Sequence, residues 1–283
     1  MVSPSRRRDA VAYLCRWHRV SERRACSVVG QHRSTQRYVA VAPQLEVQLV
    51  ARMNELAAAH PRYGYRRIWA LLRAEGFAIN RKRIERLWRL EGHRVPPQRK
   101  RHGQKAVGKA GNAAWNLMAA GRNEIWSYDF VADRTIDGLP LRILNVVDEY
   151  TRVAVGCRVE RSIGAGDIIT ELAGLFDRHG KPKLLRSDNG REFIAESLAA
   201  WLQAQGVGQA FIEKGSPQQN AYVERFNGSM RDEVLNGETF HSVLEARVVL
   251  HDWIAEYNTL RPHRGLRMMT PAAFSESINE GSR

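Results

Sequence analysis

Lys183-Leu-Leu-Arg-Ser-Asp-Asn-Gly190 and Gly215-Ser-Pro-Gln-Gln-Asn-Ala-Tyr-Val-Glu-Arg-Phe-Asn227 are the two stretches that decide the fold of this 283-residue chain. The first is an apolar run that stops at Asp188, as a buried strand does where it leaves its sheet. The second predicts a helix, because Ser216 and Gln219 have the spacing of a capping box and the proline after Ser216 is tolerated at the first helical position. The pair therefore predicts a strand that ends at an acid, followed later by a helix.

The predicted helix places a carboxylate on its polar face. Glu224 shares that face, at helical spacing, with Asn220, Asn227 and Arg231. A third carboxylate, Asp129, ends another strand-like run upstream. Three acids on separate elements, in segments without Cys or His, predict a site for magnesium rather than zinc. Two such ions about 3.5–4 Å apart activate a nucleophile and stabilise the leaving oxygen of an in-line displacement.

Other acids of the same region have alternative explanations. Asp137 precedes Gly138 in a hairpin signal. Glu192 favours the N-terminus of a helix. Asp148 and Glu149 fit the turn after a strand, and their membership of the site stays open as an alternative.

The order of predicted elements gives the fold class of the second half of the chain. Three strands joined by short turns come first, and then helices and strands alternate. This is the order of an α/β ribonuclease H-like core with a five-stranded mixed sheet. The predicted strands are 124–132, 141–148, 153–159, 183–187 and 209–212, and the predicted helices between them are 166–179 and 192–205.

The first 110 residues differ from the rest in charge. They hold 25 of the 44 Lys and Arg residues but only 7 of the 30 Asp and Glu residues, within a net charge of +14. Such a basic segment predicts binding to the phosphate backbone of DNA. A basic surface that serves only solubility is the alternative.

The same segment contains two regions whose patterns each predict helices in a helix-turn-helix order. In residues 1–42, Ser21 caps a second helix that Gly30 ends, and the third helix carries Arg33, Gln36 and Arg37 on its exposed side. In residues 43–95, Asn80 caps a third helix over 81–91. The residues of this helix predicted to contact DNA are Arg81, Lys82, Arg83 and Arg86.

The remaining domain boundaries follow from composition. Residues 96–115 form a basic linker with Arg99, Lys100 and Arg101, which are also predicted to contact DNA. Residues 116–236 form the catalytic core, and residues 237–283 form a helical tail. No apolar run is long enough to span a bilayer, and the polar, Arg-rich first residues lack the apolar core expected of a signal peptide. The three cysteines form no paired framework, which predicts a reducing cytoplasm.

At this point the chain resembles the DDE transposases, and within them the second-frame product of the insertion sequence three family. The catalytic blocks of that family, whose core is similar to retroviral integrases, are matched by 126–130, 187–190 and 216–227. Asp188 and Glu224 have 35 residues between them, the spacing associated with the group, and Arg231 matches its basic position. Further matches are Ser21–Cys26, Gly64–Ile68, Trp253–Asn258, Arg261–His263 and Thr270–Pro271. The paired His and Cys of the retroviral N-terminal zinc module are missing, which favours the bacterial branch.

The resemblance implies a specific chemistry. Transposon DNA ends would be cleaved by water, and the freed 3′-hydroxyl would attack a target phosphodiester. Asp129, Asp188 and Glu224 would hold two Mg²⁺ ions, with Mn²⁺ as a substitute, while Asn220, Asn227 and Arg231 would contact DNA.

The resemblance also implies partners and a location. The expected partners are double-stranded DNA with terminal inverted repeats, target DNA, further copies of the chain and an upstream-frame product as a fusion. The expected location is the bacterial cytoplasm at the nucleoid, without membrane contact. The alternatives are an inactive DNA-binding derivative and a nuclease that only hydrolyses.

Overall fold

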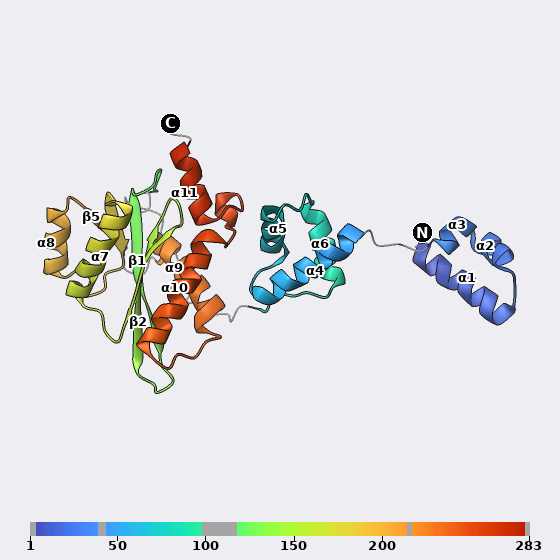
Figure 1. Cartoon of the computed structure of the whole chain (residues 1–283), viewed down its shortest axis with the longest axis horizontal. Helices are drawn as coiled ribbons and strands as arrows, with labels where there is room; N and C mark the ends of the chain where they lie inside the picture. The colour runs from blue at the N-terminus through green and yellow to red at the C-terminus, as the bar shows by residue number, and fades with distance from the viewer. Residues whose placement is uncertain (1–3, 39–43, 98–117, 214–216, 281–283) are drawn as a thin grey trace. The chain divides into compact units, whose positions relative to one another are not determined.

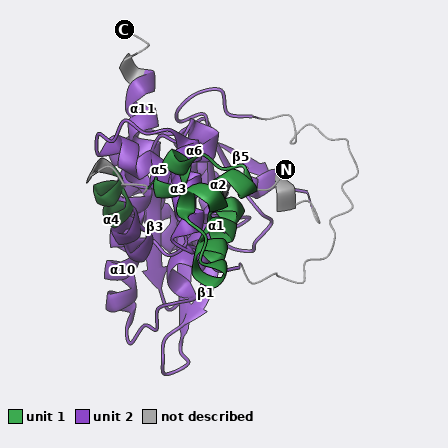
Figure 2. Cartoon of the chain, turned by 90° about the vertical axis from the view of Figure 1, so that its right-hand side faces the viewer, with its two compact units in different colours: residues 1–52 green, residues 53–283 purple. Residues whose placement is uncertain are grey.

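The computed structural model describes residues 4–38, 44–97, 118–213 and 217–280. The chain forms two compact units, residues 1–52 and 53–283 (Figure 2). Among the described residues, no helix has the length and apolar character needed to cross a bilayer.

The first unit begins with three short helices, as its apolar spacing predicts. They are α1 (Pro4–His18), α2 (Glu22–Val29) and α3 (Arg33–Arg37), around a small core of Val11, Ala25 and Cys26. The side chain of Ser21 accepts a hydrogen bond from the Arg24 amide, and Gly30 ends α2 with a φ of 66°. The predicted caps of α2 are confirmed.

The basic side chains of α3 are less free than the sequence suggests. Arg33 and Arg37 both pair with Glu22, and the Arg37 Nε lies 2.9 Å from its carboxylate. Gln36 is half-buried, since its amide accepts a hydrogen bond from Gln31 and donates one to the carbonyl of Arg8. The prediction of an exposed Gln36 is therefore wrong.

A second set of helices buries one apolar face in the same way as the first set. The set contains α4 (Gln44–Ala59), α5 (Tyr65–Ala74) and α6 (Arg81–Leu90). Asn80 caps α6 as predicted, with its side-chain oxygen 2.9 Å from the Lys82 amide nitrogen. Ile84, Leu87 and Trp88 are buried on α6, which leaves its charged residues on the other side.

The second unit contains a five-stranded sheet of order β3-β2-β1-β4-β5. Antiparallel pairing joins β1, β2 and β3, and parallel pairing joins β1 to β4 and β4 to β5. This mixed topology confirms the predicted ribonuclease H-like core. The strands are β1 (Ile125–Arg134), β2 (Pro140–Asp148), β3 (Ala154–Glu160), β4 (Leu184–Ser187) and β5 (Gly208–Phe211).

Helices cover both faces of this sheet (Figure 1). On one face, α7 (Ala165–His179) and α8 (Glu196–Ala204) pack on apolar residues such as Trp126 and Leu144. On the other, α9 (Ala221–Met230) and α10 (Val243–Thr259) pack on residues such as Ile143. Thus α10 shares the core with α9, although the sequence suggests a separate tail. The chain ends in a short 3₁₀ turn at Arg264–Leu266 and α11 (Pro271–Glu280).

Two predicted helix starts are wrong. α8 begins at Glu196 and not at Glu192, because residues 191–194 form turns after β4. α9 begins at Ala221, after a 3₁₀ turn over Pro217–Asn220. The Gln219 side chain accepts from the amide of Glu213, 2.9 Å away, while Ser216 lies outside the described residues.

Candidate functional site

The sheet register brings two of the predicted acids to one level. In the parallel pair of β1 and β4, Ser127 lies opposite Arg186. Asp129 and Asp188 each follow two residues later, so both acids lie just beyond the last paired residues. Because side chains alternate along a strand, Asp129 points to the same face as Ser127, which is the face covered by α9. The prediction that Asp129 ends its own strand is wrong: β4 ends there, while β1 continues to Arg134 as an arm paired with β2.

Asp129 is held from two sides. Its Oδ1 accepts a hydrogen bond from the amide of Phe130, and its Oδ2 accepts one from the Asn227 side chain, 2.9 Å away. Burial, together with the negative charges of Asp188 and Glu224, raises the pKa of Asp129 to about 6. The three predicted acids therefore interact electrostatically around the Asp129 carboxyl group.

Asp188 stands at the start of the loop after β4. Its Oδ1 accepts a hydrogen bond from the Gly190 amide at 3.0 Å, which closes a tight turn. The neighbouring Asn189 donates to the carbonyl of Ile212 at 2.7 Å and so fastens the loop to the end of β5.

Asn227 on α9 belongs to a chain of buried amides. The Asn145 amide, fully buried on β2, donates to the Asn227 side-chain oxygen at 2.7 Å, and Asn227 donates in turn to Asp129. Asn227 is itself only 9% exposed. The sequence predicts Asn227 on the same polar face as Glu224, yet its side chain lies toward the sheet while Glu224 is exposed. Sequence reasoning missed Asn145, although a polar residue within the apolar run 141–147 is a signal for it.

Comparison with known proteins agrees with the fold of both helical and sheet regions. Residues 44–101 match an HTH-like domain, and residues 119–217 and 205–271 match integrase core domains. The uncharacterized 31.7 kDa protein of insertion element IS407 from Burkholderia multivorans is 40% identical over 256 residues, which cover 90% of this chain and 91% of that protein. The uncharacterized 39.2 kDa protein of IS476 from Xanthomonas euvesicatoria is 37% identical, covering 97% of this chain and 78% of that protein. The transposase InsF of IS3A from Escherichia coli is 27% identical, covering 75% of this chain and 76% of that protein.

The chain belongs to the transposases of the insertion sequence three family. It has the integrase core of DDE enzymes together with an HTH-like domain in its basic front half. The second unit of the transposase therefore carries the acids, and the matched HTH-like region indicates DNA binding.

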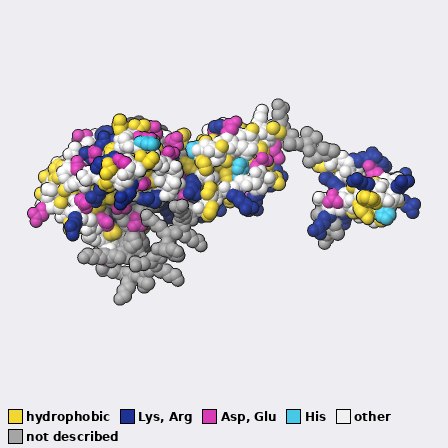
Figure 3. Space-filling model, turned by 90° about the horizontal axis from the view of Figure 1, so that it is seen from below, with side chains coloured by type: hydrophobic (Ala, Val, Ile, Leu, Met, Phe, Trp, Pro, Cys, Tyr) yellow, Lys and Arg dark blue, Asp and Glu magenta, His cyan; other side chains and the backbone are white. Residues whose placement is uncertain are grey.

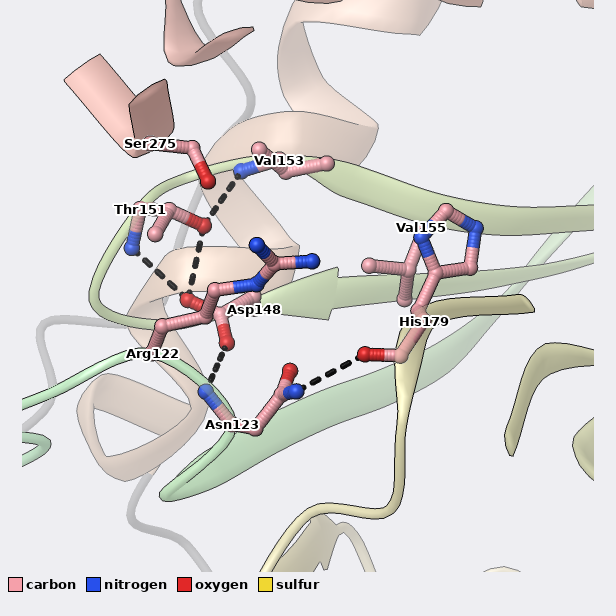
Figure 4. A pocket seen from close by; sticks show the side chains of 8 residues that line it. All are labelled: Arg122, Asn123, Asp148, Thr151, Val153, Val155, His179 and Ser275. Atoms are coloured by element: carbon pink, nitrogen blue, oxygen red, sulfur yellow. Dashed lines mark hydrogen bonds between the residues drawn. The ribbon is translucent and has the colours of Figure 1, made fainter. Parts of the chain in front are cut away.

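The alternative acids of the transposase have structural roles. Asp148 is buried, and Figure 4 shows its carboxylate accepting hydrogen bonds from the Asn123 and Thr151 amides, 2.8 and 2.7 Å away. It therefore fixes the turn after β2, as the sequence alternative states. Asp137 binds Thr135 in its hairpin turn. Glu192 pairs with Arg142 at 2.6 Å rather than starting a helix.

The remaining predicted DNA contacts are distributed unevenly. Asn220 is 2% exposed, and its side-chain oxygen has no hydrogen-bond partner among the described residues. Arg231 donates to the carbonyl of Ala132 at 2.9 Å, which holds it beside the extension of β1. On α6, Arg83 is half-buried and the other predicted contacts, Arg81, Lys82 and Arg86, are exposed. Arg99, Lys100 and Arg101 lie outside the described residues. Figure 3 shows Lys and Arg side chains on the visible surface of both units.

The donor set suits a hard divalent cation. The part of the chain that the structure describes has no three His, Cys, Asp or Glu residues already arranged to hold such an ion. The raised pKa of Asp129 shows why a cation fits: the carboxyl is half-buried near two other acids, and a divalent ion would favour its charged form. All donors are carboxylate oxygens, which is the chemistry that Mg²⁺ prefers.

Proposed function

We propose that this transposase cleaves the DNA ends of its insertion element and joins the freed 3′-hydroxyl to a phosphodiester of target DNA. The observation that supports the proposal is the register of β1 and β4, which brings Asp129 and Asp188 to the same level of the sheet. The negative charge of Glu224, on α9, contributes to the raised pKa of Asp129. The relatives support the proposal, since the family contains transposases named for insertion sequences.

The proposed residues of the metal site are Asp129, Asp188 and Glu224. They would hold two Mg²⁺ ions, for which Mn²⁺ would substitute. When bound, these ions supply activation of the attacking oxygen and neutralisation of charge on the phosphate. The hydrogen bond from Asn227 orients the Asp129 carboxylate, so we assign Asn227 to positioning rather than to DNA contact.

Other parts of the chain would deliver the DNA. The exposed basic residues of α6 suit phosphate contacts along a duplex. Arg231 lies seven residues after Glu224, at the start of the π-helical turn that follows α9. The proposed partners are the terminal inverted repeats, target DNA and further copies of the chain bound to the DNA. An upstream-frame product joined to this chain would add end recognition.

The proposal is tested with DNA carrying the element's own terminal repeats and a target plasmid. With Mg²⁺ the wild-type protein should cleave the repeat end and produce joined products. Glu224→Gln should lose both steps by a factor of about 10² or more while binding the same DNA, because the change is nearly isosteric and removes only the charge.

A matched control is Glu238→Gln, which removes an exposed carboxylate after α9. It should leave both steps unchanged. Cleavage without joined products would indicate a purely hydrolytic nuclease. DNA binding without cleavage by the wild type would indicate an inactive derivative.

A further inference from the structure

A buried ion pair lies close to the three acids, and neither of its residues is one of the three. Glu149 follows β2, and its side chain is fully buried. The Arg186 side chain on β4 is 7% exposed, and its Nη1 donates to both carboxylate oxygens of Glu149 at 3.1 Å. Neither charge is placed to hold a metal ion with the three acids, because Arg186 already occupies the Glu149 carboxylate.

The pair is connected to both acid-bearing strands. Arg186 lies two residues before Asp188 on β4. Its register partner Ser127 lies two residues before Asp129 on β1, and the Ser127 hydroxyl donates to the Glu149 carboxylate. Glu149 therefore bridges β1 and β4 directly below the position where the two aspartates emerge.

The pair also reaches the helix that carries the third acid. Arg186 Nη1 makes a long hydrogen bond of 3.4 Å to the carbonyl of Gln219, just before α9. A second link comes from Arg152 in the same turn as Glu149. The Arg152 guanidinium donates to the Glu149 carbonyl and lies over the ring of Tyr222, 3.7 Å from the ring centre. Tyr222 lies on α9, two residues before Glu224.

A buried ion pair is a weak source of stability, because desolvation of the two charges offsets their attraction. Apolar side chains of similar volume would fill the same space without that cost. The pair contributes directional hydrogen bonds, because a guanidinium and a carboxylate hold their partners at defined angles. Here those partners are the three elements that carry the acids.

We infer that Glu149 and Arg186 are positioning residues, which set the spacing of Asp129, Asp188 and Glu224 for divalent cations. The inference rests on the proposed function, because it assumes that these three acids bind metal. It adds a buried pair that the sequence places only in a turn and in an apolar strand.

The test measures metal binding directly, by isothermal titration of the full chain with Mn²⁺. In Glu149→Leu/Arg186→Met the pair is replaced by apolar side chains, so the fold should survive while the bonds to Ser127 and Gln219 are lost. The Mn²⁺ dissociation constant should rise about tenfold or more. Arg186→Lys keeps the charge opposite Glu149 but loses the planar fork. It should weaken Mn²⁺ binding in the same direction and serves if the double variant does not fold.

The matched control is a second well-buried pair among the described residues, Arg261 and Glu233, whose side chains are 6% and 10% exposed. Glu233→Leu/Arg261→Met removes charges of similar burial beyond the end of α9 and should leave the Mn²⁺ dissociation constant unchanged. Unchanged Mn²⁺ binding in both Arg186 variants, or an equal loss in the control, overturns the inference. Absence of Mn²⁺ binding by the wild type overturns the metal site of the proposed function, and the inference with it.

Discussion

Replacing Asp129 by asparagine should stabilise the metal-free protein at neutral pH. The folded state raises the pKa of this carboxyl from 3.8 to about 6, mainly through burial and then through Asp188 and Glu224. A carboxyl with a raised folded-state pKa contributes stability that is fully present below its unfolded value, near pH 4, and is lost as the pH rises through about 6. A shift of about two units corresponds to at most about 3 kcal/mol, and the asparagine amide nitrogen cannot accept one of the two hydrogen bonds made to Asp129, so we expect about 1–3 kcal/mol at pH 7.5.

The assay is thermal unfolding of the second unit's core, followed between pH 4 and pH 8 in chelator. For a unit of this size, about 1–3 kcal/mol raises the Tm by roughly 2–10 °C. Asp129→Asn should therefore melt above the wild type at pH 7.5, and the two should converge near pH 4. Addition of Mg²⁺ should stabilise the wild type and not Asp129→Asn, because ligand binding to the folded state adds to stability.

A control of opposite sign is available in the β1–β2 turn. The hydrogen bond from Thr135 holds the pKa of Asp137 below its usual value, so Asp137→Asn should lower the Tm at pH 7.5 rather than raise it. If Asp129→Asn melts at or below the wild-type temperature at pH 7.5 in chelator, the electrostatic strain among the three acids is refuted.

Three further changes probe separate parts of the molecule. Asn227→Ala removes the donor to Asp129 and should weaken Mn²⁺ binding about tenfold in a titration; binding equal to the wild type would contradict the positioning role. Lys82→Ala and Arg86→Ala should each weaken duplex binding and reduce the slope of log K against log salt by about 1, measured by fluorescence anisotropy at several salt concentrations; an unchanged slope would place the phosphate contacts elsewhere. Leu172→Ala on α7 leaves a cavity under the sheet, because Leu172 is fully buried, and should cost about 2–5 kcal/mol in urea unfolding; a loss below about 1 kcal/mol would contradict its place in the core.

The order and type of the core elements follow from the sequence because periodicity is strongest where one face is buried. Alternation in β1 and helical spacing in α7 are local patterns, and the turns at Gly138 and Gly180 have the positive φ that glycine favours. Helix starts were less predictable. The residues just before α9 form a 3₁₀ turn instead of the first turn of the helix. The Gln219 side chain accepts a hydrogen bond from the Glu213 amide and does not close a capping box.

The sequence singles out the three acids by their places in predicted strands and in a predicted helix, and their shared role stays a prediction. The contacts that hold them were not predictable, because they join residues far apart in the chain. Asn145 reaches Asn227 across 82 positions, and Glu149 reaches Arg186 across 37. Their sequence signal is only a polar residue inside or beside an apolar strand. The side-chain direction of Asn227 was missed for a related reason: helical spacing gives a face, but packing decides which edge of that face is buried.

The central claim is that Asp129, Asp188 and Glu224 hold divalent ions in one shared site. The most direct measurement replaces Mg²⁺ by Fe²⁺ in the full chain bound to DNA, generates hydroxyl radicals with ascorbate and peroxide, and maps the cuts in the protein backbone. We expect cuts near all three acids in the same sample, suppressed by excess Mg²⁺ and lost from all three segments together in Asp188→Asn. Cuts near only one of the acids, or cuts that persist unchanged in Asp188→Asn, would contradict a shared site.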